Sequence, residues 1–169
     1  FNLQIDKFYI GSFQRDTEGN DLSSPKLSKG PDKFLDVVEY YKKQNEEVEV
    51  ILTGKRRQYV MKGLIERGIS YRYFEMSSFE NINKLYNCLD LYVVSSRVEG
   101  GPQSILECSI TRTPIISTDV GIASEILSPS SIYSYQEIGK ASPDIEHAYK
   151  NVQQYLLPKG IENFDKMFK

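Results

Sequence analysis

The order of its apolar segments is the feature that most constrains the fold of this 169-residue chain. Short apolar runs with the length and composition of buried strands recur along it: 8–13, 48–53, 71–74, 91–94 and 114–117. Segments with helical periodicity lie between them: 31–43, 58–67, 82–89 and 102–111. Strands that alternate with helices form a parallel sheet covered on both faces. We therefore predict an α/β fold, a Rossmann-like domain of three α/β/α layers.

Composition excludes several functional classes. The net charge of -2 indicates no general attraction to nucleic acid or to an anionic membrane. Cys88 and Cys108 lie within apolar helical patterns, where reduced thiols are expected, and the single histidine, His147, offers no ligand set for zinc. No run approaches the roughly 20 apolar residues of a transmembrane helix, and the N-terminus lacks a signal-peptide pattern. We expect no transmembrane segment, no metal and a cytoplasmic location.

The strongest functional signal is the segment 93–108. A strand there is followed by Gly100 and Gly101, which free the chain to turn and let a ligand approach the main chain. Pro102 suits the first position of the next helix. The first amides of that helix are then expected to lack intrahelical partners: Gln103, Ser104 and Ile105. Amides at the positive end of a helix dipole attract phosphate.

Two carboxylates bracket this predicted phosphate site. Glu99 precedes the turn, and Glu107 lies about one and a half turns into the helix. A carboxylate accepts paired hydrogen bonds from neighbouring hydroxyls. The spacing therefore suits a ligand that has hydroxyls on both sides of a phosphate, as a nucleotide-sugar has.

The pattern Ser-Arg-x-Glu-Gly-Gly-Pro-x-x-x-x-Glu at 96–107, with Thr-Pro-Ile-Ile-Ser-Thr-Asp-Val-Gly at 113–121, closely resembles the glycogen-synthase-like retaining glycosyltransferases (group 1). The resemblance is to their C-terminal donor-binding domain, the C-terminal half of a GT-B fold, and it runs from about Tyr9 to Glu125. Other pieces follow in family order: Lys29-Gly30, Leu52-Thr53-Gly54 and the helix Leu85–Asp90.

The resemblance implies a function and partners. It implies a nucleoside-diphosphate sugar donor of the UDP or GDP type, no cofactor, and transfer without metal. The acceptor stays unknown, and the N-terminal acceptor domain of a GT-B enzyme has no room within this chain. We predict a nucleotide-sugar-binding domain at 1–135 and a C-terminal helical extension of the same domain at 136–169, with helical patterns at 143–156 and 164–168.

The resemblance also assigns catalytic residues. Lys29 is expected to stabilise charge on the leaving diphosphate, and Glu99 to hold the sugar hydroxyls. The family places a second basic residue where this chain has Ser12, and Arg15 is expected to replace it. The predicted substrate-binding residues are Gly11, Gly54, Glu99, Gly100, Gly101, Pro102, Gln103, Ser104 and Glu107, with Glu107 on the ribose.

Glycine turns after the strands are expected to converge on one crevice at the carboxyl ends of the sheet. The polar stretch 16–28 is expected to lie over that crevice. The charge run 55–57 could extend the positive field at the second glycine turn, but such a run is more often a solvated helix start. Arg112 stands where the family has a glycine in a left-handed conformation, which costs another residue on the order of 1 kcal/mol, so the motif helix is expected to end differently here.

An alternative function stays open, a non-catalytic nucleotide-sugar-binding or interaction module with the same fold. The presence of Lys29, Glu99 and Glu107 together favours the enzyme. A dinucleotide-dependent oxidoreductase is disfavoured, because no Gly-x-Gly-x-x-Gly follows the first strand.

Overall fold

The sheet of the domain is parallel throughout. A computed structural model describes residues 1–45 and 47–166. Its strands are β1 (Phe8–Ser12), β2 (Val48–Thr53), β3 (Ser70–Phe74), β4 (Leu91–Val94) and β5 (Ile115–Ser117). They pair side by side in the order β3-β2-β1-β4-β5. The predicted strands are confirmed with bounds that shift by one residue at most.

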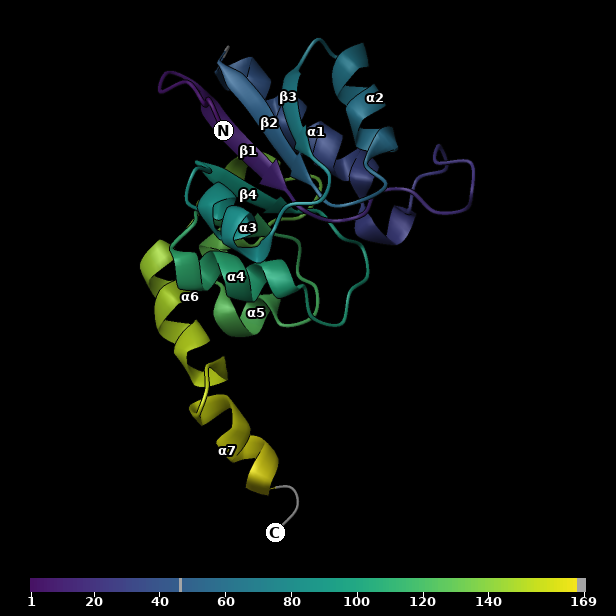
Figure 1. Cartoon of the computed structure of the whole chain (residues 1–169). Coiled ribbons are helices and arrows are strands. Elements are labelled where there is room, and N and C mark those ends of the chain that lie inside the picture. Colours follow the sequence, from purple (N-terminus) through teal and green to yellow (C-terminus); the bar gives the residue numbers. More distant parts are fainter. Residues whose placement is uncertain (46, 167–169) are drawn as a thin grey trace.

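Helices cover both faces of this sheet (Figure 1). The first layer holds α1 (Pro31–Gln44) and α2 (Gln58–Glu66), and a short 3-10 turn, η1 (Leu27–Lys29), leads into it. The second layer holds α3 (Phe79–Tyr86), α4 (Gln103–Thr111), α5 (Ala123–Ile126) and α6 (Ile145–Val152). The predicted three-layer Rossmann-like architecture is confirmed.

Alternation along the strands explains the two layers. Val50 and Leu52 of β2 join the cluster with Phe34 and Leu35 of α1, while Ile51 between them joins the opposite cluster. Successive strand residues point to opposite faces, so a strand with apolar residues on both faces has to be covered twice. All six residues of β2 are buried, as this arrangement requires.

The start of α3 differs from the prediction. Its first residue is Phe79 and its last Tyr86, whereas the apolar pattern predicted 82–89. The Ser78 hydroxyl accepts a hydrogen bond from the Asn81 amide at 3.2 Å and caps the helix. Such a cap satisfies an amide that otherwise has no intrahelical partner, and it moves the helix start upstream of the apolar residues.

The C-terminal part is broken into more pieces than predicted. In place of one helix at 143–156 the chain forms α6 and the 3-10 turn η4 (Gln153–Tyr155), followed by α7 (Lys159–Asp165), which projects away from the domain (Figure 1). Ala148 and Val152 of α6 are buried in the core, whereas the predicted piece 164–168 lies partly outside the described residues. The boundary at residue 135 stays a prediction.

Arg112 ends α4 in the conformation that a glycine usually takes. Its φ is 56° and its ψ is 30°, so the expectation of a different helix end is wrong. The strain is compensated by contacts that glycine lacks. The guanidinium lies 3.8 Å from the centre of the Tyr149 ring and pairs with Glu146, which ties the end of α4 to α6.

The described residues contain no helix that is long and apolar enough to cross a membrane. Cys88 and Cys108 are both free, as expected.

Candidate functional site at the carboxyl ends of the strands

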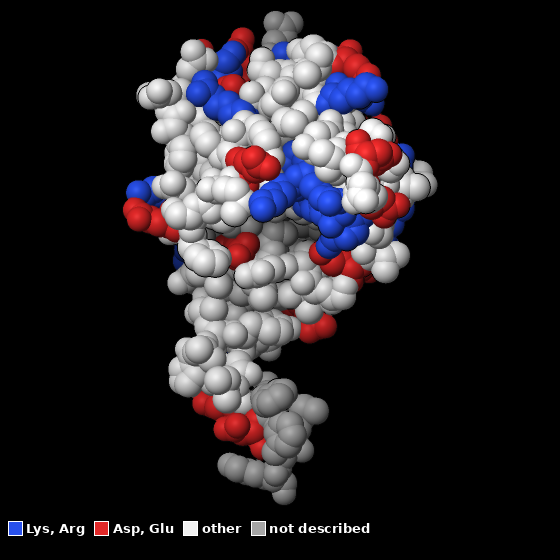
Figure 2. Space-filling model, turned by 45° about the vertical axis from the view of Figure 1, so that its right-hand side comes forward, with Lys and Arg blue, Asp and Glu red and all other residues white. Residues whose placement is uncertain are grey.

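The site lies where the strand order changes direction. From β1 the chain proceeds outward to β2 and β3, and then crosses back to β4 on the other side of β1. Ligands of doubly wound sheets bind outside the carboxyl ends of the strands at such a switch point. Figure 2 shows lysine and arginine side chains gathered on one face of the domain.

Two predicted catalytic residues meet at this point. Lys29 of η1 forms an ion pair with Glu99, which lies seventy residues further along the chain, in the loop after β4. The second oxygen of Glu99, Oε2, accepts a hydrogen bond from the Ser96 hydroxyl at 2.7 Å. Their side chains are 23% and 16% exposed, so the pair is largely shielded from water but reachable.

Gly30 holds η1 against the loop after β4. Its φ is 59°, and a Cβ at this position would lie 1.8 Å from the carbonyl oxygen of Ser95. The Ser95 hydroxyl donates to the Gly30 carbonyl at 2.8 Å, and the Arg97 amide donates to the Ser28 carbonyl at 2.8 Å. A glycine is required here for both conformation and close approach, and it fixes the backbone beside Lys29.

The turn between β4 and α4 is open. Neither Gly100 nor Gly101 has a positive φ, and a Cβ on either would meet nothing within 4 Å, so the prediction of a tight turn that needs glycine freedom is wrong. Gly121 packs on this turn instead: a Cβ there would lie 2.5 Å from the Gly100 carbonyl oxygen. The space beside Gly100 and Gly101 lets a ligand approach their main chain closely.

The start of α4 is shifted by one residue from the prediction. Pro102 is the cap residue, with ψ of 112°, and Gln103 is the first helical residue. The Ile105 amide donates to the Pro102 carbonyl at 3.0 Å, which removes it from the predicted set of free amides. The amides of Gln103 and Ser104 have no acceptor among the described residues. They stay available at the positive end of the helix.

Glu107 contacts α3 rather than the turn. It accepts a hydrogen bond from the Tyr86 hydroxyl at 2.7 Å. Burial raises the pKa of Tyr86, so this hydroxyl is a donor at neutral pH. The carboxylate lines a groove of about 170 Å³ between α3 and α4, together with Phe79 and Ile82. Because Glu107 lies on the side of α4 that faces α3, it suits a ligand that extends from the turn toward α3.

The two other glycines that were predicted to form turns, Gly11 and Gly54, have different roles. Gly11 lies inside β1, where a Cβ would lie 2.2 Å from Leu89, so the prediction that it forms a turn is wrong and its role is close packing. Gly54 does follow its strand with a positive φ of 85°, and its carbonyl accepts from the Tyr73 hydroxyl at 2.9 Å. Only the second of these two glycines forms a turn after its strand.

The tip of the polar stretch 16–28 lies away from the predicted crevice, and only its last two residues are hydrogen-bonded to the loop after β4 among the described residues. Asp16 and Thr17 are buried at its base, and its tip at Leu22 and Ser23 lines a cavity of about 750 Å³ between α1 and α2. Arg15, just before the stretch, is exposed, and its Nε donates to the Thr17 carbonyl at 2.6 Å. The predicted cation therefore remains at the surface beside the site.

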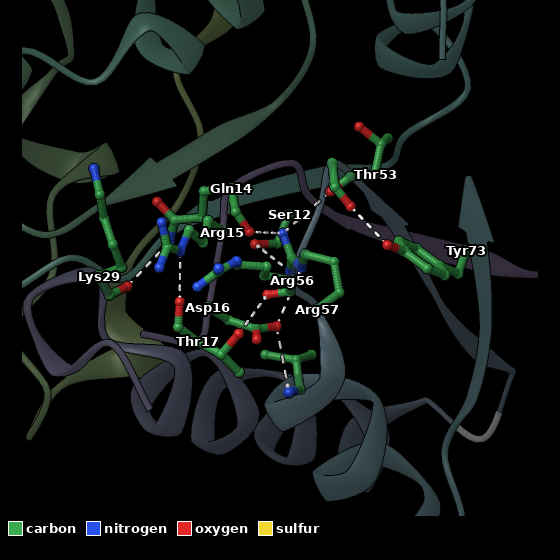
Figure 3. Close-up of polar contacts among 12 residues, drawn as sticks. Ser12, Gln14, Arg15, Asp16, Thr17, Lys29, Thr53, Arg56, Arg57 and Tyr73 are labelled. Atoms are coloured by element: carbon green, nitrogen blue, oxygen red, sulfur yellow. Dashed lines mark hydrogen bonds and ion pairs between the residues drawn. The ribbon is translucent and has the colours of Figure 1, made fainter. Parts of the chain in front are cut away.

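Arg57 is the residue that the sequence prediction missed. The run 55–57 was expected to be solvated, yet Arg57 is fully buried. Its Nε lies 3.2 Å from Oδ2 of Asp16, and its other nitrogens reach Ser12, Gln14 and Thr53 (Figure 3). A partner 41 residues away leaves no local pattern in the sequence.

Asp16 should make stability depend on pH. Burial raises the pKa of Asp16 to about 6 although Arg57 lies beside it, and Oδ1 is buried without a partner among the described residues. The folded state then keeps a proton that the unfolded chain loses near pH 4, so the free energy of unfolding should fall by roughly 2–3 kcal/mol as the pH rises from about 4 to about 6.

Denaturant unfolding across this pH range measures the effect. Asp16→Asn should abolish the decline. Asp21→Asn is the control: hydrogen bonds from Ser24 and Ser23 lower the pKa of Asp21, so its titration lies below this range. A decline that persists in Asp16→Asn would assign the pH dependence to another group.

A doubly wound parallel sheet with free amides at its switch point is the architecture on which many α/β domains bind phosphate groups. The chain belongs to the glycosyl transferases group 1 family, whose model matches residues 23–163.

Individual relatives agree with this membership. The lipopolysaccharide core biosynthesis mannosyltransferase LpsB of Rhizobium meliloti (strain 1021) is 36% identical over 64 residues, which are 38% of this chain and 18% of that protein. Among solved structures, HepE of Anabaena in complex with UDP and glucose matches with a TM-score of 0.73 at 15% identity, over 96% of this chain and 48% of HepE.

A mutant of TarM from S. aureus, in complex with UDP, fondaparinux and alpha-GlcNAc-glycerol, matches with a TM-score of 0.69 at 15% identity, over 96% of this chain and 35% of that chain. The chain thus spans less than half of these proteins. The fold is the one that these GT-B glycosyltransferases share, as the sequence predicted.

Proposed function

We propose that this chain is the donor-binding half of a retaining glycosyltransferase, which moves a sugar from a nucleoside diphosphate to an acceptor held by an N-terminal GT-B domain. The observation that carries the proposal is the Lys29–Glu99 pair beside the open start of α4. It brings a cation for phosphate and a carboxylate for hydroxyls to one point of the sheet edge.

Each group has a role in this proposal. The diphosphate binds the free amides of Gln103 and Ser104 and meets the cations Lys29 and Arg15. Glu99 exchanges its contact with Lys29 for the sugar hydroxyls, and Lys29 exchanges Glu99 for phosphate. Neither charge is left unpaired in the exchange, which keeps the cost of binding low. Positive charge beside the leaving diphosphate stabilises the transition state as the glycosidic bond breaks.

Titration of the chain with nucleotides tests the proposal. The probes are UDP, GDP and ADP and their glucose and mannose derivatives, observed by amide chemical shifts. We expect shifts at 100–104, in the loop after β1 and at Gly54 for the preferred base. Shifts confined to α6 and α7, or no binding by any nucleotide, would contradict it.

The two carboxylates should differ in what they recognise. Glu107→Ala should weaken binding of the bare nucleoside diphosphate by roughly 1–3 kcal/mol, because ribose hydroxyls lose a charged partner. Glu99→Ala should weaken the nucleotide-sugar more than the bare nucleotide. Calorimetric titration of both ligands against both variants measures the division. Tyr86→Phe is a control that removes only the hydroxyl donor to Glu107. Equal losses for both ligands in both variants would refute separate roles.

A non-catalytic nucleotide-sugar-binding module is the second candidate. It shares the titration results but predicts no transfer when the chain is part of a two-domain protein. The intact Lys29–Glu99 pair favours the enzyme, since binding alone does not need a cation that faces the leaving group. A cytoplasmic location and a UDP or GDP donor stay predictions.

A further inference from the structure

The most unusual buried group of the molecule is the guanidinium of Arg57, just before α2. It is 0% exposed and surrounded by oxygen atoms from three segments of chain. Nε and the two terminal nitrogens donate to Oδ2 of Asp16 at 3.2 Å, to the Ser12 hydroxyl at 3.2 Å and to the Thr53 and Gln14 carbonyls (Figure 3). A fixed planar fork of donors is what joins several acceptors at once.

These acceptors lie where β1 and β2 end. Ser12 is the last residue of β1 and Thr53 the last of β2, while Gln14 and Asp16 belong to the loop after β1. The main chain of Asp16 is held as well: its amide donates to the Arg56 carbonyl at 3.1 Å, and its carbonyl accepts from the Lys26 amide at 2.8 Å. The contacts of Arg57 thus define the path of the loop after β1.

That loop leads to the proposed phosphate cations. Arg57 holds the main-chain carbonyl of Gln14, and the side chain of Gln14 donates from Nε2 to the Lys29 carbonyl at 3.0 Å (Figure 3). Lys26, bound to Asp16, closes the η1 turn by accepting from the Lys29 amide at 2.8 Å. Arg15 lies between Gln14 and Asp16, so both of its neighbours are fixed by the same guanidinium. Lys29 is therefore connected to Arg57 by hydrogen bonds through Gln14, and Arg15 is connected to it through the main chain of its two neighbours.

Burying a guanidinium costs several kcal/mol of lost hydration, and apolar residues of similar size often stabilise such a position as well. The contacts of Arg57 go to loop and strand-end atoms rather than to a packed core layer. Its geometry therefore favours a function in fixing the loop over a general contribution to stability.

We propose that Arg57 is a positioning residue of the donor site, which sets the main chain that carries Arg15 and Lys29 so that both cations face the diphosphate. The inference rests on the proposed function. Arg57 itself touches no donor in this account, because it is fully buried.

The first test needs no ligand. Arg57→Lys keeps the charge but replaces the planar fork with a single ammonium. We expect its amide shifts to move at Lys29 and Gly30 and not at 100–104. Arg56→Lys, the same change one residue earlier, is the control, because the side chain of Arg56 donates to the Gly19 carbonyl at the surface and, among the described residues, to no atom of the loop segment 12–16. Unmoved shifts at Lys29 and Gly30 in Arg57→Lys would overturn the positioning role, whatever the chain binds.

The second test compares UDP with UMP, and GDP with GMP, by calorimetry. Arg57→Lys should lose about tenfold or more in affinity for the preferred diphosphate and less than about threefold for its monophosphate, because the misplaced cations serve the second phosphate. Equal losses for the two ligands would indicate a general structural defect and overturn the proposal.

A second variant covers the case in which Arg57→Lys does not fold. Gln14→Leu removes the hydrogen bond from a half-buried side chain to the Lys29 carbonyl, to which the Ser95 hydroxyl also donates at the longer distance of 3.4 Å, and should show the same selective loss. If the unmodified chain binds none of these nucleotides, the proposed function fails, while the ligand-free shifts still decide the role of Arg57.

Discussion

Lys29→Ala should lower the turnover of an intact two-domain protein by about 10²–10³-fold and reduce donor affinity far less. The reason is the position of Lys29. In the free protein Glu99 already neutralises it, so ground-state binding exchanges one anion for another. The charge that grows on the leaving diphosphate finds its full partner in the ammonium only as the glycosidic bond breaks.

Steady-state kinetics in the presence of a chelator measure this effect. Lys33→Ala is a matched control, because Lys33 lies on the surface of α1, where it pairs with Asp36. The control should keep its turnover. A loss confined to KM in Lys29→Ala, or a strict need for divalent metal, would refute a leaving-group role for this lysine.

Gly30→Ala should lower the free energy of unfolding by roughly 3 kcal/mol or more, the largest loss of stability among the substitutions proposed for this chain. Two costs combine at this residue. The left-handed conformation penalises any Cβ, and this Cβ would overlap the Ser95 carbonyl oxygen at 1.8 Å, which belongs to the backbone and has no rotamer to change.

Gly68→Ala separates the two costs. Gly68 has a similar φ of 62°, but a Cβ there meets nothing within 4 Å. This control should lose only about 1 kcal/mol, the conformational penalty alone. Urea unfolding of both variants gives the difference. Equal losses would mean that η1 and the loop after β4 separate easily, and that their contact does not hold Lys29 in place.

Local chemistry made the fold predictable. Strands such as β2 carry buried apolar residues on both faces, and the helices between strands have an apolar face, so the pattern of the sequence specified both the elements and the layers. The start of α3 was missed because a cap residue, Ser78, outweighs the apolar pattern when the helix begins. The end of α4 was missed because Arg112 obtains from Tyr149 and Glu146 a compensation that its own segment does not contain.

The site was predictable only in part, for a related reason. The resemblance to the family singled out Lys29 and Glu99, and the structure brings these two together. It did not reveal Arg57, whose burial depends on oxygen atoms from β1, β2 and a distant loop. Nor did it distinguish Gly11, a packing glycine inside a strand, from the turn glycine at Gly54. A glycine in the sequence does not say whether space or conformation requires it.

The contact of Gly121 with Gly100 supports the proposed phosphate-binding turn from outside. The turn itself contains no conformation that only glycine adopts, so its shape is not determined by its own residues. The turn packs against the main chain of the loop after β5. The approach is so close that a Cβ on Gly121 would overlap the carbonyl of Gly100. Related chains that carry the same motif at 96–107 can therefore differ in how wide the start of α4 opens, through changes in a loop more than a dozen residues away. Donor preference in such chains need not be encoded in the residues that touch the donor.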